Sequence, residues 1–248
     1  MDRGLTSLKD MKREEISVGT GFTMEMSWVS KQFLEFSKGK ALPICDVGAA
    51  YGVATLPALE QGNTVIAIEQ NPVHLATLDS RVPEALKDSL TCIQANFPDD
   101  AVDVEEGACA AILCSHMLAF LSGIRMGKAI PELYRWLAPG GKLFIINFTP
   151  YNALLSRFLP VYEARKSQGQ AWPGWVDNIF DYMPRNSISE NLPVSANYFD
   201  KGVLAKEFVA AGFRVEFDDY LSGDENLKFP EVALDGRELH GLIVSKET

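Results

Sequence analysis

The sequence has little positive charge and no long hydrophobic run. Its 248 residues carry 23 Lys and Arg against 33 Asp and Glu, which gives a formal net charge of -10. Because a polyanion must be neutralised by basic side chains, this balance argues against nucleic acid as a substrate. No apolar stretch reaches the roughly 18 residues that a transmembrane helix needs, which argues against a membrane partner.

Cysteines are also few. The chain has 4 cysteines, and they lack the short paired spacings of a zinc site and stand inside apolar runs. We therefore expect them to be reduced and buried. The first residues mix both charges and lack the apolar stretch of a secretory signal, so we expect a cytoplasmic protein.

Short apolar runs alternate with helical segments along most of the chain. The runs lie at residues 42–47, 64–68, 90–93, 108–114, 143–148, 213–217 and 239–245. Helical crossovers between neighbouring strands favour parallel pairing, and the polar connection at residues 222–237 favours an antiparallel pair at the end. This pattern predicts an α/β fold: a Rossmann-like, mostly parallel sheet of seven strands with helices on both faces.

Two segments fall outside this alternation. Residues 1–40 are expected to form an N-terminal helical cap. Residues 150–199 are rich in proline and aromatic residues, which disfavour long regular elements, so we expect a folded insert after the fifth strand, here named the lid. No linker separates these parts, and the length suits one domain over residues 1–248.

The strongest functional signal is a turn rich in small residues, followed by an acid. Asp46 ends the first strand, and Gly48, Ala50 and Gly52 follow at alternating positions. Gly48 lacks a Cβ, so its backbone can approach a ligand closely. Glu69 ends the second strand, where its carboxylate can accept hydrogen bonds from both hydroxyls of a ribose. This arrangement predicts a site for a nucleoside cofactor.

The same features leave a nicotinamide cofactor open, because an acid after a glycine-rich turn also marks dinucleotide sites. A dinucleotide fingerprint starting at Gly48 needs glycine at position 50 and glycine or alanine at position 53. The sequence has Ala50 and Val53 instead. An NAD(P)-dependent oxidoreductase is therefore the weaker alternative.

In this turn, in Glu69, and in residues 94–97 and 137–141, the sequence resembles the class I S-adenosylmethionine-dependent methyltransferases. The resemblance implies S-adenosylmethionine as cofactor, with the Gly48 turn at its methionine part and Glu69 at its ribose. The cofactor-binding residues that it implies are Asp46, Gly48, Ala50, Gly52, Glu69, Gln70, Asn96, Phe97, Ser115, His116 and Met117.

Catalytic and acceptor residues are less clearly marked. His116 is a candidate general base, although the end of a strand also suits a residue that only lines the cofactor. Methyl transfer by in-line displacement does not require a base. Four lid residues either enclose an acceptor or build the core of the lid: Tyr151, Trp172, Trp175 and Tyr182.

We thus expect methyl transfer to a small-molecule acceptor, with no nucleic acid or membrane as partner. The acid that holds magnesium in catechol-type relatives has no counterpart after the fourth strand, so we expect no metal. A module that binds S-adenosylmethionine without catalysis is the alternative. The oligomeric state stays open.

Overall fold

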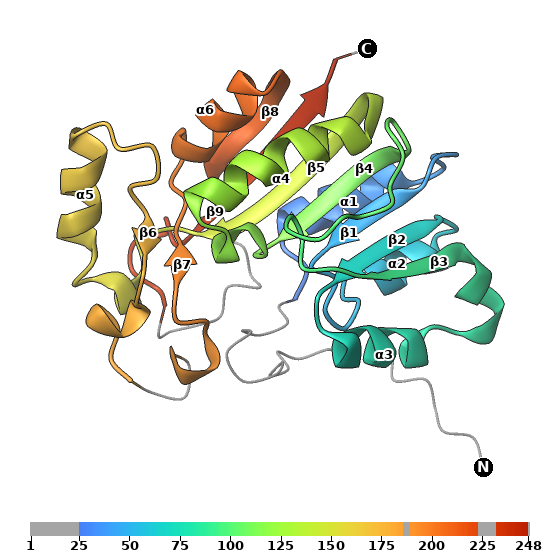
Figure 1. The fold of residues 1–248 in the computed structure, drawn as a ribbon, viewed down its shortest axis with the longest axis horizontal. Helices are drawn as coiled ribbons and strands as arrows, with labels where there is room; N and C mark the ends of the chain where they lie inside the picture. Colours follow the sequence, from blue (N-terminus) through green and yellow to red (C-terminus); the bar gives the residue numbers. More distant parts are fainter. Residues whose placement is uncertain (1–24, 186–188, 223–231, 248) are drawn as a thin grey trace.

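A computed structural model describes residues 25–185, 189–222 and 232–247 of the chain. Within these ranges one seven-stranded sheet has the order β3-β2-β1-β4-β5-β9-β8 (Figure 1). The strands of this sheet are β1 (Ile44–Val47), β2 (Val65–Glu69), β3 (Leu90–Gln94), β4 (Cys109–Ser115), β5 (Leu137–Phe148), β8 (Phe213–Tyr220) and β9 (Leu239–Lys246).

The sheet confirms the predicted fold class. β1 pairs in parallel with β2 and β4, β2 with β3, and β4 with β5. The last two strands are antiparallel to each other, and β9 is inserted between β5 and β8. The strand order reverses direction at β1 and β4, which places a ligand crevice at the carboxyl ends of these strands.

Helices cover both faces of the sheet, as predicted. They are α1 (Trp28–Ser37), α2 (Thr55–Glu60), α3 (Pro72–Arg81), α4 (Gly123–Trp136) and α6 (Val203–Ala210), whereas α5 (Leu159–Ser167) belongs to the lid. Short 3-10 helices lie at Glu84–Ser89, Leu118–Phe120, Ala153–Leu155, Ile179–Asp181 and Ser189–Asn191. None of the helices in the described ranges is both long and apolar enough to cross a membrane.

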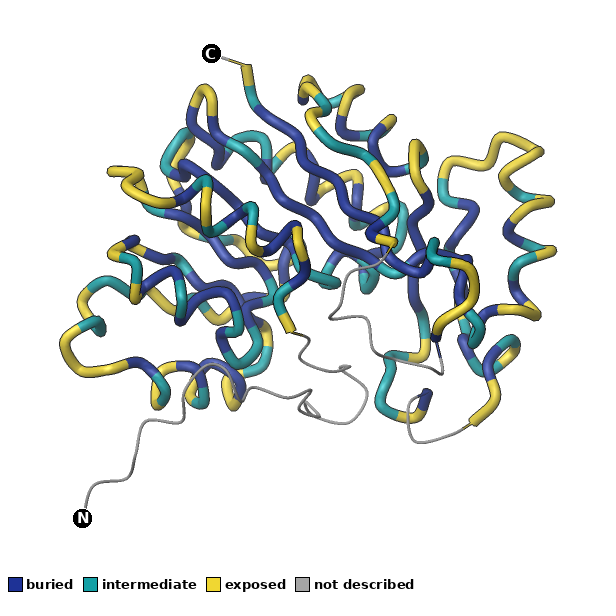
Figure 2. The backbone as a smooth tube through the Cα atoms, turned by 180° about the vertical axis from the view of Figure 1, so that it is seen from behind, coloured by how far each residue is buried: buried dark blue, intermediate teal, exposed yellow. Residues whose placement is uncertain are grey.

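Alternation along β5 shows why both faces need a cover. Leu143 and Ile145 belong to the core beneath α4 and α6, whereas Phe144 and Ile146 belong to the core beneath α1, α2 and α3. Figure 2 shows the central strands buried and the outer turns of the helices exposed. A strand that is buried on both sides must be apolar throughout, which explains the continuous apolar runs in the sequence.

Three local expectations differ from the structure. The sequence also predicts a helix over residues 52–61, closed by Gly62, but this helix, α2, begins at Thr55, because Gly52 has a φ of +83° and its neighbours form a turn. The fifth strand begins at Leu137, and a bulge in its pairing with β4 accommodates the glycines that follow. Cys92 is exposed, contrary to the expectation that all cysteines are buried, because β3 is an edge strand.

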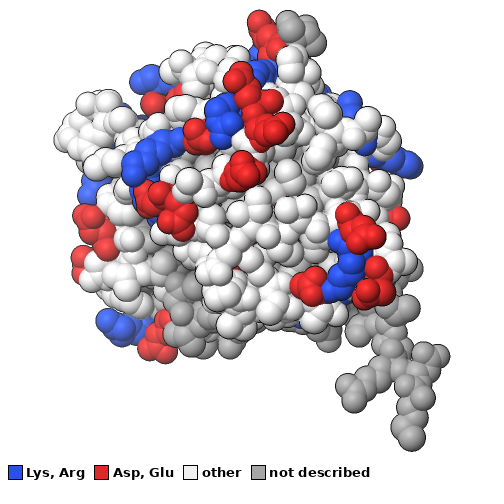
Figure 3. Space-filling view, turned by 45° about the vertical axis from the view of Figure 1, so that its right-hand side comes forward, with Lys and Arg blue, Asp and Glu red and all other residues white. Residues whose placement is uncertain are grey.

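Basic side chains on the surface are paired with acids. Ion pairs join Lys87 to Asp79 and Lys201 to Asp219. On the face drawn in Figure 3, Lys and Arg stand beside Asp and Glu and form no continuous basic patch. That face therefore offers no surface suited to a polyanion.

The lid has a core of its own. A two-stranded antiparallel sheet, β6 (Trp175–Val176) and β7 (Ala196–Asn197), lies beside α5 at one end of the main sheet (Figure 1). Phe158, Tyr162 and Ile179 are fully buried there, together with Tyr151 and Met183. Aromatic side chains supply much of this core, since the short elements of the lid bury few aliphatic residues.

One buried carboxylate connects the lid to the main sheet. Asp200 is 1% exposed and accepts hydrogen bonds from the hydroxyls of Tyr162 at 2.8 Å, Tyr151 at 3.3 Å and Tyr220 of β8 at 2.5 Å. Lys166 of α5 also donates to it. Burial raises the pKa of Asp200, but the hydrogen bonds from Lys166 and the tyrosines outweigh burial and hold the pKa below its ordinary value.

We expect Asp200→Ala to lower the free energy of unfolding by roughly 3 kcal/mol, because the hydroxyls of Tyr162 and Tyr220 lose their acceptor and Lys166 loses its partner. Asp79→Ala is the matched control: it removes an exposed ion pair with Lys87 and should cost less than about 1 kcal/mol. Urea denaturation of both variants measures the difference. Equal losses would show that the carboxylate does not anchor the lid.

Candidate active site

A cavity of about 250 Å³ lies at the carboxyl ends of β1, β2 and β4. Nearly all of the residues predicted to bind the cofactor line it together: Asp46, Gly48, Ala50, Glu69, Gln70, Asn96, Phe97, Ser115, His116 and Met117. Gly52 is the exception, because a Cβ there would lie 2.2 Å from Cδ1 of Leu78, so this glycine allows α3 to pack closely. The sequence pattern thus marks the walls of one cavity.

The turn after β1 has an unusual backbone that brings it close to the end of β4. Gly48 has a φ of +80°, and a Cβ at this position would lie 2.7 Å from Cβ of Met117. Ala50 also has a positive φ of +46°, a region that disfavours residues with a Cβ. Glycine at position 48 is therefore required by space as well as by conformation.

Glu69 holds this turn in place. Its Oε2 accepts a hydrogen bond from the backbone N–H of Ala50 at 3.1 Å, and its Oε1 accepts one from the N–H of Asn71 at 2.9 Å. His74 of α3 places its Nδ1 3.5 Å from Oε1. The side chain is only 8% exposed and lines the cavity. Each carboxylate oxygen retains a lone pair for a ligand hydroxyl.

Asp46 is a second buried carboxylate beside the turn. Its Oδ2 accepts a hydrogen bond from Oγ1 of Thr55 at 2.7 Å. Burial raises the pKa of Asp46 to about 6, and the negative charge of Glu69 adds to this effect. The two acids together make this end of the cavity receptive to a cation or to several hydrogen-bond donors.

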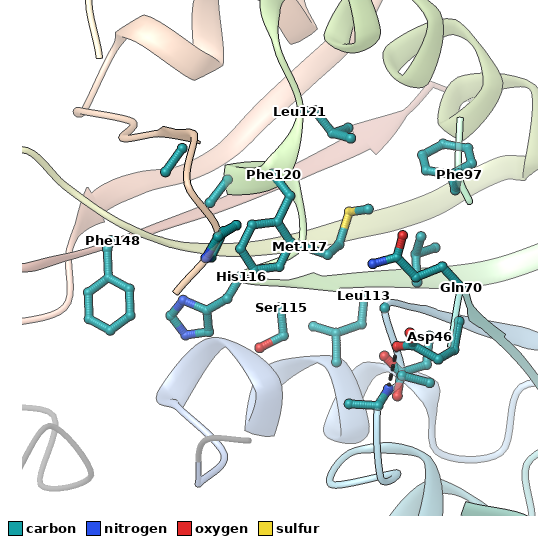
Figure 4. A pocket seen from close by; sticks show the side chains of 18 of the residues that line it. Asp46, Gln70, Phe97, Leu113, Ser115, His116, Met117, Phe120, Leu121 and Phe148 are labelled. Atoms are coloured by element: carbon teal, nitrogen blue, oxygen red, sulfur yellow. Dashed lines mark hydrogen bonds between the residues drawn. The ribbon is translucent and has the colours of Figure 1, made fainter. Parts of the chain in front are cut away.

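Phe97 lies after β3, at the same end of the cavity as Gln70 (Figure 4), and Asn96, which precedes it in the chain, also lines the cavity. Arg125 of α4 fixes this corner: its Nη2 donates to Oδ1 of Asn96 at 2.8 Å and to the carbonyl of Phe97 at 3.0 Å. Its Nε lies 2.8 Å from Asp99. No pattern in the sequence connects Arg125 with the segment after β3, since the two are distant in the chain.

His116 follows β4 at the other end of the cavity, where its ring lies beside that of Phe148 (Figure 4). The ring centroids are 4.9 Å apart. His116 has a φ of +60°, and its buried Nδ1 has no hydrogen-bond partner among the described residues. Burial lowers the pKa of the imidazole to about 4, so the ring is neutral at physiological pH.

The four aromatic lid residues predicted for the acceptor do not line this cavity. Tyr151 donates to Glu163 and Asp200, and Tyr182 packs on Phe158 with ring centroids 5.0 Å apart. Trp172 packs edge-on against Phe199, and Trp175 donates to Asp177. Tyr151 and Tyr182 contribute to the core of the lid, which is the second of the two roles considered for them, whereas Trp172 packs against the core beneath α4 and α6.

Other residues supply the wall near His116. They were not predicted from the sequence, because they come from separate segments that meet only in the fold. They include Phe148, Asn152, Leu154, Met183 and Tyr198. Met183 and Tyr198 belong to the predicted insert, but the sequence prediction named other residues of that insert.

The family model of the methyltransferase domain matches residues 45–145, which span β1 to β5 and every strand end described above. These residues are identified as a methyltransferase domain. No curated sequence is significantly similar to the chain.

Solved structures support the fold of this methyltransferase domain. A SAM-dependent methyltransferase from Methanosarcina mazei is 15% identical, with 90% of this chain and 99% of that chain covered and a TM-score of 0.65. The glycopeptide N-methyltransferase MtfA in complex with S-adenosylmethionine is 13% identical, with 92% and 96% covered and a TM-score of 0.61. A methyltransferase from Mesorhizobium loti is 16% identical, with 88% and 98% covered and a TM-score of 0.60.

We expect Ala50→Gly to keep or raise the free energy of unfolding, by up to about 1 kcal/mol, because glycine relieves the strain of a positive φ. Ala49→Gly is the control in the same turn. Ala49 is buried and has no such φ, so this change should cost roughly 0.5 to 1 kcal/mol. Urea denaturation measures both, and equal losses would contradict the strain at Ala50.

We also expect the ring of His116 to stay neutral down to about pH 5, since burial lowers its pKa to about 4. Histidine Cε1 resonances followed by NMR from pH 8 to 4 measure this. The chain has 3 histidines, and His116→Gln identifies the signal by its loss. Titration of this signal near pH 6.5 would mean that water reaches the ring freely.

Proposed function

We propose that the cavity binds S-adenosylmethionine along the ends of β1, β2 and β3 and holds a small-molecule acceptor beneath the lid. The observation that carries this proposal is Glu69, whose carboxylate is fixed by two backbone N–H groups and still faces the cavity. A carboxylate fixed in this way suits the two hydroxyls of a ribose.

The residues present fit this cofactor. Gly48 lets the turn after β1 lie against Met117 without a collision, and both residues line the cavity, so an extended ligand can run along the turn toward Glu69. Asn96, Phe97 and Gln70 offer a polar edge and an aromatic face at the far end, which suits an adenine base. Asp46 and Glu69 place two carboxylates near the middle, which suits a ligand that carries positive charge.

When bound, S-adenosylmethionine would supply a methyl group on a positively charged sulfur: a lone pair of the acceptor forms a bond to the methyl carbon, and the electrons of the broken carbon–sulfur bond stay on the sulfur of the S-adenosylhomocysteine that leaves. The chain would contribute mainly position, and well-oriented reactions gain roughly 7 to 11 kcal/mol from it. His116 is neutral and presents an unpartnered Nδ1. It can accept the proton of an O–H or N–H nucleophile and later release it to water.

Residues 150–199 act in this proposal as the cover of the acceptor. The lid supplies Asn152, Leu154, Met183 and Tyr198 to the cavity wall, and Asp200 fixes its position against β8. Residues 1–40 would serve as a cap over the cofactor: α1 contributes Ser30 to the wall, whereas residues 1–24 lie outside the described residues. A concave cavity of this size favours a compact acceptor over a polymer.

Calorimetric titration with S-adenosylmethionine and S-adenosylhomocysteine tests the proposal, with NAD as the control ligand. We expect micromolar binding of the first two compounds and none of NAD. Binding of NAD alone would replace the proposal with a dinucleotide-dependent activity.

Glu69→Gln should weaken S-adenosylhomocysteine binding by about tenfold or more, because hydrogen bonds to a charged group are worth roughly 1.5 to 3 kcal/mol. Glu60→Gln, an exposed position at the end of α2, should leave the affinity unchanged. Melting curves of both variants establish that they are folded. An unchanged dissociation constant for folded Glu69→Gln would exclude the ribose contact.

A further inference from the structure

The two ends of the cavity differ in charge. Asp46, Glu69 and Arg125 line the part formed by the ends of β1 and β2 and by α4. Glu25, which precedes α1, is a further acid on the cavity wall. The lining residues that the described part of the lid contributes are all uncharged, and Leu154 and Met183 are typical of them. A charged ligand group in this apolar part would be desolvated without a partner, which is costly.

Two polar atoms interrupt this apolar wall. Asn152 is 2% exposed, and its Nδ2 donates to the carbonyl of Thr149 at 2.9 Å. Only the nitrogen of an amide can donate to a carbonyl, so this bond fixes the orientation of the side chain. Oδ1 of Asn152 is buried and has no hydrogen-bond partner among the described residues.

The second atom is Nδ1 of His116, which is likewise buried and unpartnered within the described ranges. His116 holds a positive φ of +60°, a conformation that non-glycine residues adopt mainly at functional sites. Phe148 lies against its ring and lines the same cavity. Buried polar atoms are nearly always satisfied, so two unsatisfied polar atoms on residues that line one cavity indicate a polar ligand group, and Oδ1 of Asn152 requires a donor.

We propose that the acceptor is an uncharged, largely apolar molecule that donates a hydrogen bond from O–H or N–H to Oδ1 of Asn152 and presents its nucleophilic atom to His116. This inference rests on the proposed function and specifies its acceptor. Asn152 orients the acceptor by direct contact, and the apolar lid residues reject anions and cations.

A set of para-substituted benzenes tests the proposal by calorimetry on protein saturated with S-adenosylhomocysteine. 4-Butylphenol is neutral and carries a donor, and 4-butylanisole is neutral without one. 3-(4-Hydroxyphenyl)propanoate and tyramine carry the same phenol with a negative and a positive charge. We expect 4-butylphenol to bind about tenfold more tightly than each of the other three.

Asn152→Leu should remove the preference for 4-butylphenol over 4-butylanisole. Asn197→Leu is the matched control, because Asn197 is also buried, donates its Nδ2 to a carbonyl and has an unpartnered Oδ1, but does not line the cavity. Both variants lose one internal hydrogen bond, so equal melting temperatures separate the binding effect from a folding effect.

The outcomes are distinguishable. Failure of S-adenosylhomocysteine to bind would overturn the proposed function itself. With that ligand bound, equal or tighter binding of a charged compound, no binding of any compound, or equal effects of the two asparagine variants would overturn this inference alone.

Discussion

The carboxylate of Glu69 is the constraint on which the candidate site depends. It joins two loops that follow neighbouring strands, through the N–H groups of Ala50 and Asn71. Without it, these buried donors would lose their acceptor, and the strained turn at Ala50 would lose an interaction that offsets its positive φ. The group that faces the cavity is therefore also the one that shapes the wall beside it, so binding and local stability are coupled at this position.

The part of the site near β1 and β2 could be predicted from the sequence because its geometry is local. A strand, a turn with Gly48 and a second strand ending in Glu69 fix their own relative positions through parallel pairing. Gly52 shows the limit of this reasoning. Its place in the motif suggested a ligand contact, but the space it leaves is taken by Leu78 of α3, a contact that only the packing of the helix reveals.

The position of the lid in the chain could be predicted from the sequence, but the role of each of its residues could not. Proline and aromatic residues marked it as an insert, yet the same composition serves a core and a binding wall equally well. Which role each residue takes depends on distant partners. Tyr151 donates a hydrogen bond to Asp200 and does not line the cavity, whereas Tyr198 directly follows β7 and does line it. Cys92 was misjudged for a similar reason, since the edge position of β3 follows from the strand order.

Charge is divided within the cavity in a way that suits two different ligands. The carboxylates and Arg125 lie at the end of the cavity that the ends of β1 and β2 and helix α4 form. A cofactor bound at this end would need the same hydrogen bonds whichever acceptor is methylated. At the end beneath the lid, burial lowers the pKa of His116, so its imidazole is neutral. Among the described residues no acid is hydrogen-bonded to its Nδ1, where an acid would raise the pKa. A base held neutral by burial accepts a proton without first losing one, and an uncharged wall leaves the choice of acceptor to shape and to the few polar atoms that remain unpaired.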